Sequence, residues 1–325
     1  MIVKTAHYFE DFYCLADQCP NTCCANWNIP IDRQTRDHYM ELEGEMGELA
    51  RRVLKGETFK NQNDRCPFLQ ENGLCSMILA ANGSQEDLSY VCHTYPRKIA
   101  NYGNERHISL SVSCPMAARL LMQCMDGIRF VEQVVDEPPM LNSIDPAWFR
   151  ELLQIRQDSI AIVQSKETSL CKNIDKLLEE YQIKQKGKSV YKQSLGLIRL
   201  FMLLRYNDPS MKEKIRVLCK KNQLKQALAH WQIVFDQHQM LFENLLVYML
   251  DRYVMEAVDD CKFAPRIALC VAWCRMLYLL VCNHYAQHGS LDDTTLEELI
   301  VAFSRQTEHC DQNLIRLMRF SRWVL

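Results

Sequence analysis

Residues 14–27 read CLADQCPNTCCANW and place four cysteines within eleven positions: Cys14, Cys19, Cys23 and Cys24. A protein core seldom uses adjacent cysteines, whereas a loop that wraps a metal ion delivers several thiolates to one point. Pro20 and Asn21 are residue types that suit such a loop. The segment therefore predicts a loop that binds a soft metal ion or an iron–sulfur cluster.

A second and more widely spaced set of cysteines continues through the first 115 residues. In DRCPFLQENGLC (64–75), the Asn72-Gly73 pair predicts a tight turn that brings two thiols together. Prolines stand beside or near three of the later cysteines, where each removes a backbone donor and stiffens its loop. These later cysteines are Cys66, Cys75, Cys92 and Cys114.

Spacing alone does not identify what the eight clustered cysteines bind. They could form two four-thiolate sites, or one cluster with additional structural or reactive thiols. Ferredoxin spacing is absent, and Asn26 stands where the C-x3-C-x2-C run of radical S-adenosylmethionine enzymes would need its next cysteine. Buried free thiols or disulfides are the alternative interpretation.

Composition restricts the location and partners of the protein. Lys and Arg number 38 against 40 Asp and Glu, a balance that does not favour a nucleic acid or an anionic lipid partner. Acidic residues interrupt the apolar positions of the N-terminal twenty residues, so we expect no secretory signal. We therefore expect a cytoplasmic protein whose thiols are reduced.

The distribution of glycine, proline and cysteine predicts a mainly α protein with two domains. Residues 1–137 hold nine of the sixteen cysteines and seven of the ten glycines, which predicts a metal or iron–sulfur domain of short strands and loops. Within it, 32–54 has helical composition and 106–112 alternates as a strand does. Residues 138–325 contain few helix breakers, and we expect an all-α domain there.

Helical spacing supports the prediction for the second domain. Asp145 before Pro146 is typical of a helix N-cap followed by a first-turn proline. The apolar segment 267–286 approaches membrane-spanning length, but Arg275 at its middle favours a buried helix over a membrane span. Three sets of residues each share one helical face: Leu195, Ile198 and Met202; Leu246, Met249, Leu250 and Tyr253; and Leu269, Trp273, Met276 and Leu280.

Four motifs stand out in the cysteine-rich part of the chain: CxxxCCxxWxIxID (19–32), RCPFL (65–69), GLC (73–75) and LSxxCxxYPR (88–97). Taken together, these motifs resemble those of the flagellin lysine-N-methylases, a family related to small zinc- or iron-chelating proteins with cysteine clusters. The resemblance is strongest over residues 7–115. One departure is Asn26, where the family often has glycine, so we expect a different loop conformation there.

The resemblance implies methyl transfer from S-adenosylmethionine to surface lysines of flagellin, with a [4Fe-4S] cluster held by some of the cysteines. It does not identify a catalytic residue. Zinc is the alternative metal. The candidate ligands are Cys19, Cys23, Cys24, Cys66, Cys75, Cys92 and Cys114.

The implied chemistry sets two requirements on the site. No G-x-G-x-x-G motif occurs, so the cofactor must bind in another way, for example on an iron with an open coordination position. Arg97 is a candidate partner for the cofactor carboxylate, or for a structural carboxylate. The target lysine must also lose a proton before its nitrogen attacks. Candidate bases, each of which has an ordinary structural role as its alternative, are Tyr95, Glu71, Asp64, His93 and His107.

Two other functions are compatible with the same residues. In the first, zinc only stabilises a non-catalytic helical interaction protein. In the second, exposed thiols at Cys23 and Cys24 exchange metal or electrons, as in a redox or metal-delivery protein.

Overall fold

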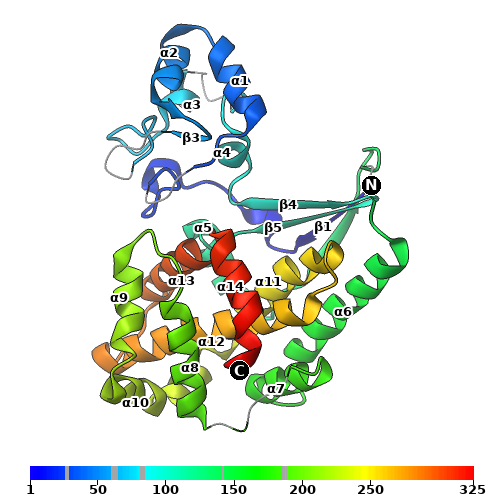
Figure 1. The fold of residues 1–325 in the computed structure, drawn as a ribbon, viewed down its shortest axis with the longest axis vertical. Coiled ribbons are helices and arrows are strands. Elements are labelled where there is room, and N and C mark those ends of the chain that lie inside the picture. Colours follow the sequence, from blue (N-terminus) through cyan, green and yellow to red (C-terminus); the bar gives the residue numbers. More distant parts are fainter. Residues whose placement is uncertain (26–28, 60–64, 81–84, 141–142, 184–186, 188) are drawn as a thin grey trace.

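The computed structural model describes residues 1–25, 29–59, 65–80, 85–140, 143–183, 187 and 189–325. These residues form fourteen α-helices and two small sheets, which confirms the prediction of a mainly α protein. A small lobe lies at the top of Figure 1, a sheet lies beneath it, and a larger body of helices forms the bottom.

The larger sheet has four strands: β1 (Ile2–Ala6), β4 (Arg97–Tyr102), β5 (Glu105–Leu110) and β6 (Phe130–Val134). Their order is β4-β5-β1-β6, in which β1 runs parallel to β5 and the other neighbours are antiparallel. The strand predicted at 106–112 is confirmed as β5. Its pairing with β1 places the start of the chain beside a segment about one hundred residues later.

The small lobe contains α1 (Arg33–Glu41), α2 (Gly44–Val53), β2 (Leu54–Lys55), β3 (Thr58–Phe59), α3 (Ser76–Ala80) and α4 (Tyr90–Thr94). The helical composition at 32–54 is thus confirmed as two helices, with a break at Leu42 and Glu43. Asp32 caps α1, because its carboxylate accepts a hydrogen bond of 2.8 Å from the Thr35 amide.

The helical body contains α5 (Pro115–Met122), α6 (Pro146–Gln164), α7 (Leu170–Glu180), α8 (Val190–Met202), α9 (Pro209–Val217), α10 (Lys221–Ala229), α11 (Trp231–Val254), α12 (Phe263–His288), α13 (Asp293–Thr307) and α14 (Asp311–Phe320). Short 3-10 helices are η1 (Phe9–Asp11), η2 (Ala16–Gln18), η3 (Met255–Val258) and η4 (Ser321–Trp323). The predicted cap of α6 is confirmed, because the Asp145 side chain accepts a hydrogen bond of 2.8 Å from the Ala147 amide.

The two longest helices, α11 and α12, form the centre of the body. The faces predicted on them from helical spacing are buried in the structure. One helix among the described residues, α12, is long and apolar enough to cross a membrane. However, 89% of its most apolar segment is buried inside the protein. Arg275 at its middle forms an ion pair with Asp175, Nη2 to Oδ1 3.5 Å. These contacts agree with the prediction of a buried helix.

The buried apolar side chains form two cores. The main core joins the helices of the body to Tyr8 and to buried residues between Leu110 and Ile128. The domain boundary predicted at 137/138 stays a prediction. The second core belongs to the small lobe and consists of Ile29, Ile31, Tyr39, Ala50, Val53, Phe59, Cys66, Phe68 and Met77.

Candidate cysteine centre and the polar network behind it

Four of the predicted ligand cysteines come together against the core of the small lobe. Cys66 is buried in this core, and Cys24, Cys75 and Cys92 pack against it. The Cys66 amide donates a hydrogen bond of 2.8 Å to the Cys24 carbonyl, which joins the first cysteine segment to the second. Cys24, Cys75 and Cys92 each raise the pKa of Cys66 through their charge, so the four thiols interact electrostatically. We call these four residues the cysteine centre.

Local turns and caps place the side chains of the cysteine centre. The predicted turn at Asn72-Gly73 is confirmed: Gly73 has φ +82°, and the Asn72 side chain accepts a hydrogen bond of 3.0 Å from the Leu74 amide. This turn pairs Leu69 with Cys75. Ser89 caps α4, because its hydroxyl accepts a hydrogen bond of 3.3 Å from the Cys92 amide.

Burial and neighbouring groups give these thiols different acidities. Burial raises the pKa of Cys66 to about 12 and that of Cys92 to about 11. A hydrogen bond with Cys23 lowers the pKa of Cys24 to about 7, while burial opposes this shift, and Thr22 and Arg305 reinforce it. The same hydrogen bond raises the pKa of Cys23. Cys24 is therefore the thiol of this pair that ionises first.

The remaining predicted ligands lie in a second group. Burial raises the pKa of Cys114, and the charges of Cys19 and Cys14 raise it further. Cys114 stands directly before α5, and the Cys19 thiol donates to the Asn21 carbonyl at 3.3 Å. Cys23 interacts electrostatically with Cys24, Cys92 and Cys14, so it lies between the two groups. The structure thus divides the predicted ligands into two neighbouring groups.

The donor chemistry of the cysteine centre fits a thiophilic metal, because four thiols from separate segments lie in or against one apolar core. The side chains do not form a coordination shell: over the described ranges, no three or more His, Cys, Asp or Glu side chains are placed to hold a metal ion. The metal centre predicted from the sequence therefore stays a prediction.

The other predicted site residues lie outside the cysteine centre. The Arg97 guanidinium lies over the Phe12 ring at 5.0 Å and the Phe9 ring at 5.9 Å. Its predicted role at the cofactor stays a prediction. Asn26, Trp27 and Asp64 lie outside the described residues.

The candidate bases occupy different surroundings. Glu71 and His93 are exposed, and the His107 ring lies 3.1 Å from the Glu105 carboxylate. Tyr95 is within hydrogen-bond distance of the Ser113 hydroxyl, at 3.0 Å, and burial raises its pKa above the usual range. Tyr95 therefore stays protonated at neutral pH and is a hydrogen-bonding group there.

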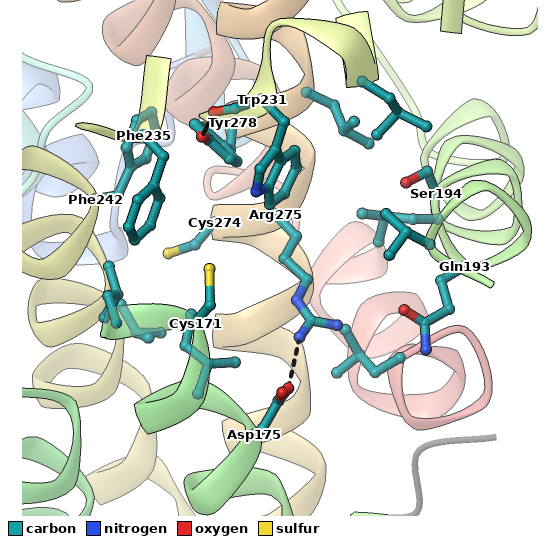
Figure 2. A pocket seen from close by; sticks show the side chains of 18 of the residues that line it. Cys171, Asp175, Gln193, Ser194, Trp231, Phe235, Phe242, Cys274, Arg275 and Tyr278 are labelled. Carbon is teal, nitrogen blue, oxygen red and sulfur yellow. Dashed lines mark hydrogen bonds and ion pairs between the residues drawn. The ribbon is translucent and has the colours of Figure 1, made fainter. Parts of the chain in front are cut away.

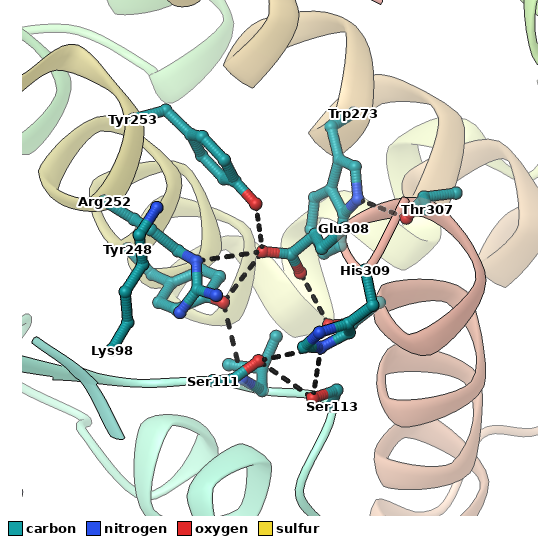
Figure 3. A network of polar contacts seen from close by, with 12 residues as sticks. Lys98, Ser111, Ser113, Tyr248, Arg252, Tyr253, Trp273, Thr307, Glu308 and His309 are labelled. Atoms are coloured by element: carbon teal, nitrogen blue, oxygen red, sulfur yellow. Dashed lines mark hydrogen bonds and ion pairs between the residues drawn. The ribbon is translucent and has the colours of Figure 1, made fainter. Parts of the chain in front are cut away.

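Through Ser113, Tyr95 contacts a buried polar network that the sequence did not predict (Figure 3). At its centre, the Glu308 carboxylate accepts hydrogen bonds of 2.9 Å from the hydroxyls of Tyr248 and Tyr253 and one of 2.6 Å from the Ser304 hydroxyl. The Arg252 Nε atom lies 3.6 Å from the same carboxylate. The network thus balances a buried carboxylate with one guanidinium and three hydroxyl donors.

The network extends from Glu308 toward the cysteines through serine and histidine side chains. The Ser113 hydroxyl lies 2.8 Å from His309 Nε2 and 2.8 Å from the Ser111 hydroxyl, in addition to its contact with Tyr95. Burial and the nearby positive charge of Arg252 lower the pKa of His309 to about 3. His309 is therefore neutral at physiological pH.

Arg305 on α13 joins the first cysteine segment to the helical body. Its guanidinium donates to the Ser113 carbonyl at 3.0 Å, the Thr22 carbonyl at 3.2 Å and the Asn21 carbonyl at 2.5 Å. These contacts hold the loop that carries Cys19 to Cys24 against α13. The sequence offers one weak indication of this role, the polar run 304–309 that follows the apolar positions of α13.

Comparison with known proteins identifies the family to which this chain belongs. Residues 140–322, more than half of the chain, match the family model described as the FliB lysine N-methylase C-terminal domain. The chain belongs to the FliB lysine N-methylase family. The resemblance stated from the cysteine motifs is thereby confirmed through the other part of the chain.

Curated relatives in the FliB family match a shorter region. The Lysine-N-methylase of Salmonella choleraesuis (strain SC-B67) is 25% identical over 143 residues, which cover 39% of this chain and 34% of that protein. The match to the "Flagellar biosynthetic protein FliU" of Salmonella muenchen has 27% identity over 141 residues, 39% of this chain and 80% of that protein. The aligned region thus spans about a third of the curated Lysine-N-methylase. No solved structure matches the chain.

Proposed function

We propose that this protein is a protein-lysine N-methyltransferase that transfers methyl groups from S-adenosylmethionine to surface lysines of flagellin. The match of residues 140–322 to the FliB lysine N-methylase family carries this proposal. The names of the relatives support both the reaction and the flagellar substrate, since one is a Lysine-N-methylase and another is a flagellar biosynthetic protein. A cytoplasmic location is part of the proposal, because thiols stay reduced there.

The proposed cofactor is a [4Fe-4S] cluster held by residues of the cysteine centre, namely Cys24, Cys66, Cys75 and Cys92. This assignment is supported by the position of the four thiols in or against one apolar core. If bound there, such a cluster would supply an iron able to hold S-adenosylmethionine. Cys19 and Cys114, with Cys23 between the groups, are the alternative ligands.

The chain's own residues support this centre in two ways. Arg305 holds the backbone of the Cys19 to Cys24 loop through the carbonyls of Asn21 and Thr22. Hydrogen bonding lowers the pKa of Cys24 to about 7, which makes its thiolate available to a metal near neutral pH. Both features favour a loop that presents a thiolate over a loop of inert buried thiols.

The first experiment measures the metal content of protein purified without oxygen. Iron and sulfide at about four per chain are expected for the cluster, and Cys66→Ala, Cys75→Ala or Cys92→Ala should each lose most of both. Cys219→Ala, at an exposed cysteine in the helical body, is the matched control and should retain them. Zinc alone would favour the non-catalytic interaction protein instead.

The second experiment tests the reaction itself. The purified protein is mixed with flagellin and S-adenosylmethionine carrying a labelled methyl group, and flagellin lysines are examined by mass spectrometry. Labelled methyl-lysine that disappears in the Cys66→Ala protein would support the cluster-dependent methylase. Labelled lysine that persists in that variant would separate methyl transfer from the cysteine centre.

A further inference from the structure

A cavity of about 700 Å³ lies in the helical body among α7, α8, α10, α11 and α12. Figure 1 places these helices in the body below the sheet, on the opposite side of the sheet from the small lobe. The volume falls within the roughly 300–1,000 Å³ that small-molecule sites occupy. The cavity is therefore a candidate binding site separate from the cysteine centre.

One end of the cavity is a wall of aromatic side chains, Trp231, Phe235, Phe242 and Tyr278 (Figure 2). The Tyr278 ring lies edge-on to its neighbours, with its centroid 4.0 Å from that of Trp231 and 4.4 Å from that of Phe242. The Tyr278 hydroxyl donates a hydrogen bond of 2.5 Å to the Trp231 carbonyl. The polar tip of Tyr278 is thus satisfied by the protein, and the rings present an apolar, preformed surface.

The guanidinium of Arg275 lies in the wall of this apolar cavity. Among the described residues that line the cavity, Arg275 is the one with a positive charge. Its guanidinium reaches the Asp175 carboxylate at 3.5 Å, a long ion pair whose Asp175 side chain is 51% exposed. A guanidinium has five N–H donors, so one long contact to a half-exposed carboxylate leaves capacity for a second acceptor.

We propose that this cavity binds an amphipathic carboxylate, that is, a molecule with one carboxylate and an apolar alkyl tail such as a fatty acid. The carboxylate would pair with the Arg275 guanidinium, whose planar fork matches two oxygens. The tail would lie against the wall formed by Trp231, Phe235, Phe242 and Tyr278. This site goes beyond the methylase function and does not depend on it.

The charge of Asp175 should affect the affinity for a carboxylate ligand in the opposite direction from the charge of Arg275. The Asp175 carboxylate occupies the guanidinium that the ligand needs, so it competes with an anionic ligand and repels it. Removal of the Asp175 charge should strengthen the binding of a carboxylate. It should not strengthen the binding of a neutral molecule with the same tail, because that tail makes no contact that depends on Asp175.

The test uses the full chain and a dansyl-labelled undecanoic acid, whose fluorescence rises in an apolar site. We expect a Kd on the order of 10 µM and displacement of the probe by laurate but much less by dodecanol. Arg275→Leu should weaken probe binding at least about tenfold, whereas Asp175→Asn should strengthen it about threefold. Asp158→Asn, on the exposed side of α6, is the charge-matched control and should leave the affinity unchanged.

Three results would overturn the proposal. The first is no binding of the probe at about 1 mM. The second is displacement by dodecanol as effective as displacement by laurate. The third is an Asp175→Asn protein that binds the probe no more tightly than the wild-type protein, and this variant decides the question if Arg275→Leu fails to fold.

Discussion

Arg305 is the residue at which the helical body holds the first cysteine loop. Three carbonyl groups, from Asn21, Thr22 and Ser113, accept hydrogen bonds from its guanidinium. A lysine ammonium in the same place lacks the planar fork that reaches acceptors in different directions. The loop position therefore depends on the geometry of the side chain as well as on its charge.

We accordingly expect Arg305→Lys to lower the free energy of unfolding by about 1–3 kcal/mol, because carbonyl groups near Cys24 lose their donors. Urea unfolding measures this loss. In metal-free protein, Cys24 should also react faster with iodoacetamide, as followed by peptide mass spectrometry. Arg216→Lys, at an exposed pair with Glu213, should change neither quantity. Equal behaviour of the two variants would show that Arg305 does not hold the loop.

Glu308 and Arg252 form a buried pair of opposite charges. The Glu308 side chain is 0% exposed and that of Arg252 is 7% exposed, so the two charges have little solvent to screen them. Glu308→Gln removes the counter-charge of a buried guanidinium, and we expect a loss of about 3–5 kcal/mol in the free energy of unfolding. Tyr253→Phe removes one hydrogen bond and should cost only about 1 kcal/mol.

Chemical denaturation of both variants checks this order. Glu213→Gln, at an exposed carboxylate in the helical body, serves as the control and should stay within about 0.5 kcal/mol of the wild-type protein. A Glu308→Gln protein less destabilised than Tyr253→Phe would contradict the assignment of Glu308 as the centre of the network.

Among the elements, the pairing of β1 with β5 depends on charged side chains as well as backbone hydrogen bonds. Lys4 on β1 lies 2.9 Å from the Glu105 carboxylate on β5 and 3.2 Å from Glu132 on β6. A hydrogen bond with His107, followed by contacts with Lys4, lowers the pKa of Glu105 to about 2 against the opposing effect of burial. The ionised carboxylate thus stabilises the sheet.

The sign of the resulting pH dependence follows from this lowered pKa. The contribution of Glu105 is fully present above its unfolded pKa of about 4.3 and is lost as the pH falls toward 2. We expect the difference in unfolding free energy between wild-type protein and Glu105→Gln to fall to about half by pH 3. Urea unfolding at several pH values measures this difference. Glu132→Gln, at the more exposed partner of Lys4, should show a smaller difference, and a gap that widens in acid would refute the mechanism.

The elements differ in how well the sequence predicts them. Helices α11 and α12 follow from apolar residues at helical spacing, because that pattern depends only on neighbours within a few turns. Strand β5 was predicted from alternation, whereas β1 carries Lys4 within a short run and pairs with residues about one hundred positions away. Pairing over such a separation leaves no local pattern to detect.

In the whole molecule, the cysteine centre was predictable as a concentration of thiols but not as a particular set of four. The density of cysteines near Cys24 and the Asn72-Gly73 turn indicated convergence. The polar network was not predicted, because a glutamate such as Glu308 is rarely buried and a histidine such as His309 has no strong preference for the core. Only the packing of α11 and α13 against the segment that carries Ser113 buries them.

The small lobe and the helical body should differ in how far their amide hydrogen exchange changes when metal is removed. Among the described residues, the core of the small lobe contains nine buried apolar side chains, far fewer than that of the helical body, and Cys24, Cys75 and Cys92 pack against them. If the proposed metal is bound there, chelation should raise amide hydrogen exchange between residues 29 and 95 roughly tenfold or more, because part of the lobe's stability comes from ligation. Exchange in α11 and α12 should stay unchanged.

Hydrogen exchange with mass spectrometry measures both regions in one sample. Cys66→Ala protein is the control, since chelation should have no further effect on a lobe that has already lost its metal. A uniform rise across the lobe and α12 would indicate that the two cores unfold together, contrary to this prediction.

The contact between Arg305 and Thr22 also has a consequence for biogenesis, because the two residues are 283 positions apart in the chain. A ribosome that adds about 5–20 residues per second needs roughly 15–60 s to make the intervening segment. During that interval the Cys19 to Cys24 loop emerges without the side chain that holds it. The loop therefore reaches its final position only after synthesis of α13, which favours loading of a metal centre after translation and leaves the nascent thiols dependent on a reducing environment.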